Sequence, residues 1–387
     1  MPVSDGDIVV RLAARGDGVT GDGRFVAGAA PGDRIAADGA ILPGAHHQAP
    51  PCRHFPECGG CQLQHVDDAA YADYLKDRIA SALAAQGLAP PEIRTPHLSP
   101  PRSRRRAQLK AAGGVIGFNA EGSHRIVDMR ECHVLRPELF DLVAPLRRML
   151  TGRAGAAMTL ADQGVDLLLE GVSAEGLAQA EALTGFARTH RLARLSLDDG
   201  YGPQTMWEPE PVTATLGGVP VPLPHNAFLQ ATADGEAALV AAVREAVGEA
   251  RLVADLFAGL GTFALSLRGR VYAAEGARDA VLALKSARRE GLFVDHRDLF
   301  RRPLDAAELG RFEAVVLDPP RAGAKEQMPL LAVSPVPRIA YVSCNPATFA
   351  RDARTLADAG CRLDWVQPVG QFRWSTHVEL VGRFSRA

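Results

Sequence analysis

Apolar and polar positions alternate in three different ways along this chain. Over residues 1–48, short apolar runs such as 8–13 and 24–27 are separated by turns rich in Gly and Asp. Short runs of this kind are typical of a small β-barrel, whereas a flexible acidic arm would not repeat apolar residues in each run. We therefore expect an OB-like barrel over residues 1–48.

In the next stretch, residues 49–230, some segments have apolar residues at helical spacing and others at the spacing of a strand. Helical spacing of apolar positions occurs over 69–86, 137–150 and 175–190, and strand-like runs occur at 108–112, 115–118, 125–127 and 166–170. This mixture predicts a central α+β domain with mostly antiparallel strands.

From residue 231 to residue 387 the pattern becomes regular. Strands are expected at 251–257, 270–275, 314–318 and 338–343, and helices at 235–247, after the Gly-rich turn at 259–261, and at 279–291. Alternation of this kind predicts a parallel, doubly wound α/β sheet of the Rossmann type. Two closely spaced strand candidates, 364–368 and 377–384, suit an antiparallel edge.

Composition adds limits to this picture. A chain of 387 residues with 47% hydrophobic and 23% charged positions belongs to a folded protein of two or three domains, not to a disordered one. No apolar run approaches the roughly 18 residues of a membrane helix, and the N-terminus lacks a secretory signal pattern. We expect a monomeric cytoplasmic protein.

The net charge of −2 excludes a strongly basic coat, so any binding of nucleic acid must use local patches. One candidate is the dense basic run formed by Arg102, Arg104, Arg105, Arg106 and Lys110. A solvated surface loop explains these charges equally well.

Four of the six cysteines point to a metal. Cys52, Cys58 and Cys61 fall within ten residues, and Cys132 stands alone further on. Six cysteines are too few for a disulfide scaffold in a chain of this length. The spacing C-x5-C-x2-C…C differs by one residue from a known iron–sulfur pattern, while zinc sites more often pair two C-x2-C units. We predict a [4Fe–4S] cluster, with zinc as the competing metal.

A Gly-rich turn in the last stretch has the features of a nucleotide site. Asp255-Leu-Phe-Ala-Gly-Leu-Gly follows a strand, and Glu275 ends the next strand, where a carboxylate can accept hydrogen bonds from ribose hydroxyls. Such a turn can also serve packing alone. Ala264 at the third position of the dinucleotide fingerprint leaves NAD open, although the combination favours a nucleoside cofactor.

Three further motifs should meet at the same sheet edge. Asp318 follows a buried strand and precedes two prolines, Cys344 leaves a strand just before Asn345-Pro346, and Glu379 lies at the last strand. A helix N-terminus lowers the pKa of a thiol, which predicts a nucleophilic Cys344 with Glu379 as general base. The alternative, a buried structural cysteine, describes Cys361 better.

Together these motifs resemble the RNA uracil-C5 methyltransferases, which make 5-methyluridine. The stretches that carry the resemblance are Asp255-Leu-Phe-Ala-Gly-Leu-Gly, Leu317-Asp-Pro-Pro-Arg-Ala-Gly-Ala, Val342-Ser-Cys-Asn-Pro-Ala-Thr-Phe-Ala-Arg-Asp and Thr376-His-Val-Glu. The family's Phe-Pro-x-Thr-x-His-Val-Glu appears here as Phe372-Arg-Trp-Ser-Thr-His-Val-Glu, without the proline. The resemblance covers the whole chain and is closest to members with an iron–sulfur cluster that act on 23S rRNA.

The resemblance implies S-adenosyl-L-methionine as cofactor and RNA as partner, 23S rRNA before tRNA. It implies that the barrel is a TRAM domain and that the four cysteines hold the cluster. Residue by residue, it places the following in the cofactor pocket: Gln230, Phe257, Thr262, Glu275, Asp298 and Asp318.

The chemistry of the implied reaction is consistent. Attack by the Cys344 thiolate at C6 of a flipped-out uracil makes C5 nucleophilic, C5 takes the methyl group, and Glu379 removes the C5 proton. A DNA cytosine-C5 methyltransferase is a rival, but its nucleophile follows proline, whereas Cys344 follows Ser343. A non-catalytic RNA-binding protein, or a redox-sensing iron–sulfur protein that keeps the cofactor pocket, is the alternative from another class.

Overall fold

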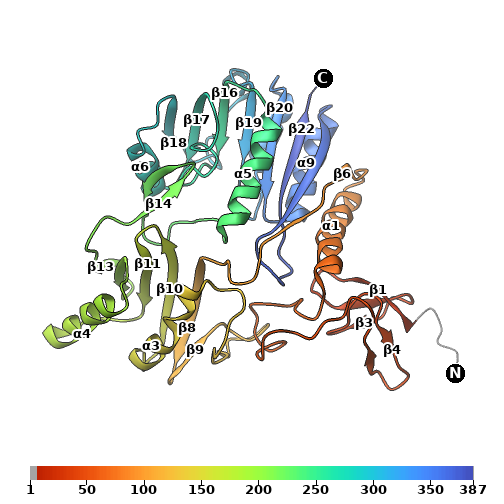
Figure 1. The fold of residues 1–387 in the computed structure, drawn as a ribbon. Coiled ribbons are helices and arrows are strands. Elements are labelled where there is room, and N and C mark those ends of the chain that lie inside the picture. Colours follow the sequence, from red (N-terminus) through yellow and green to blue (C-terminus); the bar gives the residue numbers. More distant parts are fainter. Residues whose placement is uncertain (1–6, 387) are drawn as a thin grey trace.

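The computed structural model describes residues 7–386. Figure 1 shows a large C-terminal sheet with the central region on one side below it and the N-terminal strands on the other. Residues 1–6 of the expected barrel, and residue 387, lie outside the described part of the chain.

The C-terminal sheet has nine strands, with eight in the order β18-β17-β16-β19-β20-β22-β21-β6 and β7 paired beside β6 on β21. Strands β18 to β20 are parallel, and β22 runs antiparallel between β20 and β21. The strands are β6 (Glu92–Ile93), β7 (His97–Leu98), β16 (Leu252–Leu256), β17 (Arg270–Glu275), β18 (Leu292–His296), β19 (Ala314–Leu317), β20 (Arg338–Ser343), β21 (Arg362–Gly370) and β22 (Glu379–Ser385). The expected doubly wound α/β sheet is therefore present, and its antiparallel strand β22 lies inside the sheet rather than at its edge, because β21, β6 and β7 continue the sheet beyond it.

Helices cover both faces of this sheet because successive strand residues point to opposite sides. In β19, Val315 and Leu317 join a core with α1, α8 and α9, whereas Ala314 and Val316 join a second core with α5 and α6. The helices are α1 (Asp68–Ala85), α5 (Ala233–Val247), α6 (Arg278–Ser286), α7 (Ala306–Leu309), α8 (Met328–Val333) and α9 (Pro346–Asp358).

Residues 68–98 belong to this sheet rather than to the central sheet, although the sequence pattern groups them with residues 49–230. Helix α1 packs on α9, and β6 and β7 pair with β21. Figure 1 shows this orange segment running along the edge of the blue strands. Strands of two residues have no readable period, so the pattern could not reveal this pairing.

Two expectations in the C-terminal stretch are wrong. No helix forms after the Gly-rich turn; the chain makes separate turns, and the Arg289 guanidinium donates to the carbonyls of Ala264 and Leu267, which a continuing helix would use. Strand β18 was not expected. It is an edge strand in which only Val294 is buried, so it has little apolar signal.

The central region is a six-stranded sheet in the order β13-β12-β11-β10-β8-β9, antiparallel except between β11 and β12. Its strands are β8 (Arg106–Ala112), β9 (Val115–Gly117), β10 (Ala154–Ala161), β11 (Gly164–Glu170), β12 (Arg194–Asp198) and β13 (Gln204–Trp207), with α2 (Pro137–Phe140), α3 (Val143–Met149) and α4 (Gly176–Thr189). The single helix expected over 137–150 is two helices. In a continuous helix, the ring of Pro145 would clash with the carbonyl of Asp141.

A hairpin, β14 (Thr213–Leu216) and β15 (Val219–Pro222), links the central sheet to α6 of the C-terminal sheet. The N-terminal strands form two small sheets: β1 (Val9–Leu12), β2 (Gly18–Thr20) and β3 (Phe25–Val26), and β4 (Arg34–Ile35) with β5 (Ile41–Leu42). A bridge between Ile8 and Arg34 and a shared core of Val9, Ala29 and Ile35 join them. Their closure into a TRAM-like barrel stays a prediction.

Within residues 7–386, no helix is both long and apolar enough to cross a membrane.

Candidate active site

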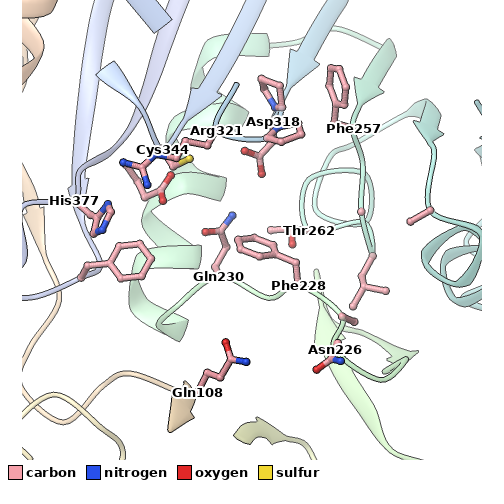
Figure 2. Close-up of a pocket in the computed structure, with 18 of the residues that line it drawn as sticks. Gln108, Asn226, Phe228, Gln230, Phe257, Thr262, Asp318, Arg321, Cys344 and His377 are labelled. Atoms are coloured by element: carbon pink, nitrogen blue, oxygen red, sulfur yellow. The ribbon is translucent and has the colours of Figure 1, made fainter. Parts of the chain in front are cut away.

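A cavity of about 1270 Å³ lies where the carboxyl ends of the C-terminal strands face the central sheet. Its lining includes all eight residues expected to act in catalysis or cofactor binding: Gln230, Phe257, Thr262, Glu275, Asp298, Asp318, Cys344 and Glu379. Figure 2 shows Cys344 and Asp318 on the strand side of the cavity, Gln230 and Phe228 in its middle, and Gln108 of β8 opposite. The site is therefore built from two parts of the chain.

Cys344 and Glu379 are brought together by strand pairing. The antiparallel ladder between β20 and β22 ends with Ser343 opposite Leu380, and Cys344 directly follows Ser343 while Glu379 directly precedes Leu380. The charge of Glu379 acts on the Cys344 thiol, which shows that the two side chains are close to each other. Strand pairing therefore brings both residues to the same end of the ladder, at the wall of the cavity.

The charge state of Cys344 differs from the expectation. Burial, the Glu379 carboxylate and Asp318 together raise the pKa of the Cys344 thiol to about 11. The N-terminus of α9 does not offset this, so the prediction of a lowered pKa is wrong for the free protein. The protonated thiol is therefore the favoured form of Cys344 in the free protein at neutral pH.

The two carboxyl groups beside Cys344 titrate near neutrality. Burial raises the pKa of Asp318 to about 7. Burial, and then the charge of Asp318, raise the pKa of Glu379 to about 8. Perturbed carboxyls of this kind are suited to accept and return protons at pH 7 to 8.

The cofactor side of the cavity is shaped by the Gly-rich turn. The Glu275 carboxylate accepts the N–H of Gly259 at 2.8 Å and that of Ala277 at 2.6 Å, which ties β17 to the turn. Phe257 has a φ of +64°, a conformation that is strained for a bulky residue and common at functional sites. The centroid of its ring lies 5.5 Å from that of the Phe300 ring, so the two tilted rings contact each other and together border one slot of the cavity.

Asp298 is half-exposed at the rim of the same slot. Its Oδ1 accepts the N–H of Phe300 at 3.0 Å, so it shapes the loop that carries this ring.

Helix α9 holds the loop after Asp318 in place. Asn345 and Thr348 donate to the carbonyl of Arg321, and Arg351 donates to that of Ala322. The buried Asp352 accepts the N–H of Ala324 at 3.0 Å and the hydroxyl of Tyr341 at 2.5 Å. Because α9 begins directly after Cys344, this contact fixes Cys344 relative to Asp318 and Arg321.

The basic run is mostly structural. Arg105 pairs with Glu236 at 2.6 Å and donates to the carbonyl of Gln230, and Arg106 donates to that of Leu229. Lys110 pairs with Glu170 at 3.1 Å. Charge counting could not distinguish a phosphate-binding patch from arginines that hold the segment around Gln230.

Several residues of the cavity were missed by sequence reasoning. Arg321 and His377 lie beside Cys344, Gln108 and Phe228 lie toward the central sheet, and Gln371 is buried behind the wall. Arg321 stands in the same motif as Asp318, and His377 in the same motif as Glu379. These two motifs could therefore have indicated both residues as members of the site. Gln371 has no such signal, because its role depends on contacts between distant segments.

The four cysteines of the expected cluster border one second cavity, of about 20 Å³. Burial raises the pKa of each thiol, most of all for Cys61, where it reaches about 12. Over residues 7–386, however, no group of three or more His, Cys, Asp or Glu side chains is arranged to hold a metal ion. The expected cluster therefore stays a prediction.

Comparison with known proteins gives a consistent picture. The sequence model of the tRNA (uracil-5-)-methyltransferase family matches residues 291–384. The chain is 57% identical to a protein of Zymomonas mobilis named an uncharacterized RNA methyltransferase, over 98% of this chain and 99% of that one. It is 32% identical to the 23S rRNA (uracil(1939)-C(5))-methyltransferase of Halomonas elongata, over 88% of this chain and 77% of that one.

Among solved structures, the fold matches the tRNA (uracil-54, C5)-methyltransferase of Pyrococcus abyssi in complex with S-adenosyl-L-homocysteine. The TM-score is 0.73 at 22% identity, over 97% of this chain and 98% of that one. The arrangement of the sheets is thus shared over nearly the full length.

Proposed function

Since this chain belongs to the family of S-adenosylmethionine-dependent RNA (uracil-C5)-methyltransferases, we propose that it methylates C5 of one specific uridine in structured RNA through a covalent bond between Cys344 and C6. The observation that carries the proposal is that Cys344, directly after β20, and Glu379, the first residue of β22, line the same cavity and that the charge of Glu379 acts on the Cys344 thiol. A shared fold alone would not support this, because function resides in the site.

The residues divide the work as follows. The thiolate form of Cys344, whose proton has passed to solvent, adds to C6 of the uracil, so that electron density reaches C5 and C5 takes the methyl group. S-adenosylmethionine supplies that methyl group from its sulfonium. Glu379 then takes the proton from C5, and elimination restores the double bond and releases Cys344 as thiolate. The raised pKa of Glu379, about 8, makes it a stronger base than an ordinary carboxylate.

The cofactor is proposed to lie along Phe257, Thr262, Glu275 and Asp298, with Gln230 and Asp318 near the methyl group. Glu275 keeps unused acceptor capacity for ribose hydroxyls after its two backbone hydrogen bonds. The rings of Phe257 and Phe300 border the cavity and offer apolar surface against which the adenine ring can pack.

We propose 23S rRNA as the substrate in preference to tRNA. Support comes from the Halomonas elongata enzyme, whose name specifies 23S rRNA and which matches most of this chain.

We also propose that Cys52, Cys58, Cys61 and Cys132 hold a [4Fe–4S] cluster. The support is that residues from two distant segments border one cavity and that the Arg104 guanidinium lies near Cys61 and Cys132, where it would balance thiolate charge. A space of about 20 Å³ holds roughly one water, so the surrounding loops must widen on binding. We prefer the cubane to zinc because the spacing C-x5-C-x2-C…C is one residue from a known iron–sulfur pattern, whereas zinc sites more often pair two C-x2-C units.

The test uses the variant Glu379→Gln with S-adenosylmethionine and fragments of 23S rRNA or tRNA. Without the base, the methylated adduct cannot eliminate, so a protein–RNA species that survives denaturing electrophoresis should accumulate. Glu290→Gln, at an exposed position, is the control and should turn over without an adduct. Absence of any adduct with either RNA would overturn the covalent route. Mapping of 5-methyluridine in cells lacking this chain identifies the target.

A further inference from the structure

Gln371 is a buried polar residue at the junction of the two halves of the site. It follows β21 directly and is 2% exposed, and its amide has two hydrogen-bond partners. Oε1 accepts the backbone N–H of Ala231 at 2.9 Å, and Nε2 donates to Oε1 of Gln230 at 2.8 Å. Val369, two residues before Gln371, pairs with Glu379 across the ladder of β21 and β22, so Gln371 and Glu379 are on the same face of the sheet, and the Gln371 side chain lowers the pKa of the Glu379 carboxyl.

These contacts determine which way two amides point. A backbone N–H can only donate, so the atom of Gln371 that faces Ala231 must be the oxygen. The NH2 group of Gln371 therefore faces Gln230 and Glu379, and the atom of Gln230 that receives it must be an acceptor oxygen. The NH2 group of Gln230 is then left for the cavity that Gln230 lines.

We propose that Gln371 is a positioning residue that donates one hydrogen to the Glu379 carboxylate and the other to Gln230, and so turns the NH2 group of Gln230 toward an acceptor oxygen of the bound ligand. The proposal rests on the proposed function of Glu379 and Gln230. Gln371 itself contacts neither substrate nor cofactor.

The packing around Gln371 leaves it no freedom to turn. Gly235 in the first turn of α5 lies directly against it, and a Cβ at Gly235 would come within 2.7 Å of the Cβ of Gln371. Glycine inside a helix costs about 0.5 to 1 kcal/mol relative to alanine, so this close approach is maintained at some cost in stability. The Gln371 side chain is therefore held between the backbone N–H of Ala231 and the backbone of Gly235.

Gln371 also matters for the charge of Glu379. The charged or titratable groups that face Glu379 are Asp318 from the end of β19 and Cys344 from the end of β20, with Arg321 and His377 further along the wall. Asp318 and burial oppose ionisation of Glu379, whereas the hydrogen bond from Gln371 favours it. Loss of that donor should raise the pKa of Glu379 further.

The experiment compares Gln371→Met and Gln371→Glu with the parent protein. Methionine keeps the volume but removes every hydrogen bond, and glutamate keeps the acceptor for Ala231 but cannot donate when ionised. The pKa of Glu379 is read by NMR on protein labelled at the glutamate carboxyl carbons, its signal identified by its loss in Glu379→Gln. We expect an upward shift of about one pH unit in Gln371→Met and a larger one in Gln371→Glu.

Gln327→Met is the matched control. Gln327 is equally buried and makes two hydrogen bonds, to the N–H and carbonyl of Leu304, outside the cavity. The Gln327→Met variant should lose about as much stability as Gln371→Met. It should change neither the pKa of Glu379 read by NMR nor the acid limb of the pH–rate profile.

The outcomes separate the two proposals. Equal carboxyl pKa values in the parent protein and both Gln371 variants overturn the positioning role. If the pKa moves as expected but the parent protein methylates no RNA, the positioning role stands and the proposed function fails. Where RNA is methylated, the acid limb of kcat/KM should move to higher pH together with the NMR value.

Discussion

The residues that line the large cavity at Cys344 and the small cavity at the four cysteines are held in place to different degrees. In the large cavity, Cys344 and Glu379 lie at the end of the ladder between β20 and β22, and Gln371, α9, Arg105 and Arg106 hold the residues around them. In the small cavity, four cysteines from a loop and a distant segment border a space of about 20 Å³, and no group among residues 7–386 is arranged to bind an ion.

This contrast follows from the backbone. Strand ends are placed by many cooperative hydrogen bonds, so a site built on them exists before its ligand arrives. Cysteines on loops gain their geometry largely from the metal, and metal binding is then coupled to folding. Mutations in the large cavity should therefore change the rate of the reaction. Mutations of the four cysteines should instead change the metal content and the stability of the protein.

The largest expected effect is that of Cys344→Ala. Loss of the nucleophile should lower methyl transfer by at least about 10³-fold, while the cofactor still binds because its contacts lie elsewhere in the cavity. Transfer of labelled methyl groups to RNA and calorimetry with S-adenosylhomocysteine measure the two properties. Cys361→Ala, a buried cysteine outside the cavity, should keep activity. Methylation that persists in Cys344→Ala would reject a covalent intermediate.

Protein purified without oxygen should contain about four irons per chain and be brown, as a cubane cluster requires. Cys132→Ser should lose the iron and the colour and should unfold at a lower temperature, because the ligand no longer joins the two segments. Iron analysis, visible absorption and thermal melting measure these effects, with Cys361→Ser as the control. A colourless protein with one zinc would contradict the cluster.

The stability of the free protein should fall as pH rises. Carboxyls in an unfolded chain titrate near pH 4, whereas Asp318 and Glu379 titrate at about 7 and about 8 in the folded protein. Between these limits the folded state binds more protons than the unfolded state, so the free energy of unfolding decreases through pH 4 to 8. Asp318→Asn should flatten the curve of melting temperature against pH. Asp358→Asn, at an exposed ion pair, should leave its slope unchanged.

The smallest expected effect concerns the contact between α9 and the loop after Asp318. Tyr341→Phe removes the hydroxyl that donates to Asp352 and should cost about 1 to 2 kcal/mol in chemical denaturation. Tyr272→Phe removes a similar bond, to Asp295, away from this loop. If both variants lose stability but only Tyr341→Phe also loses a few-fold in turnover, the contact positions the loop. Equal turnover in the two variants would show that it does not.

The sequence predicted the meeting of Cys344, Glu379 and Asp318 because parallel strands bring their carboxyl ends to one edge. It could not predict the pKa of Cys344, since the helix N-terminus is visible in a sequence but the desolvation and the two facing carboxyls are not. It missed β6 and β7, because two-residue strands have no period, and it could not separate structural from phosphate-binding arginines. Gln371 could not be identified either, because its hydrogen-bond partners Gln230 and Ala231 lie 141 and 140 residues away in the sequence.

The segment at residues 68–98 has a consequence for how this protein can be dissected. The Tyr71 hydroxyl of α1 donates to the carbonyls of Phe372 and Ser375, and the N–H groups of Gln62 and Leu63 bind the carbonyl of Trp374. The first quarter of the chain thus anchors the hairpin that leads into Glu379. A fragment beginning near residue 231 would expose the flank of β21 and leave that hairpin unsupported, so the methyl-transferring half is not a portable module.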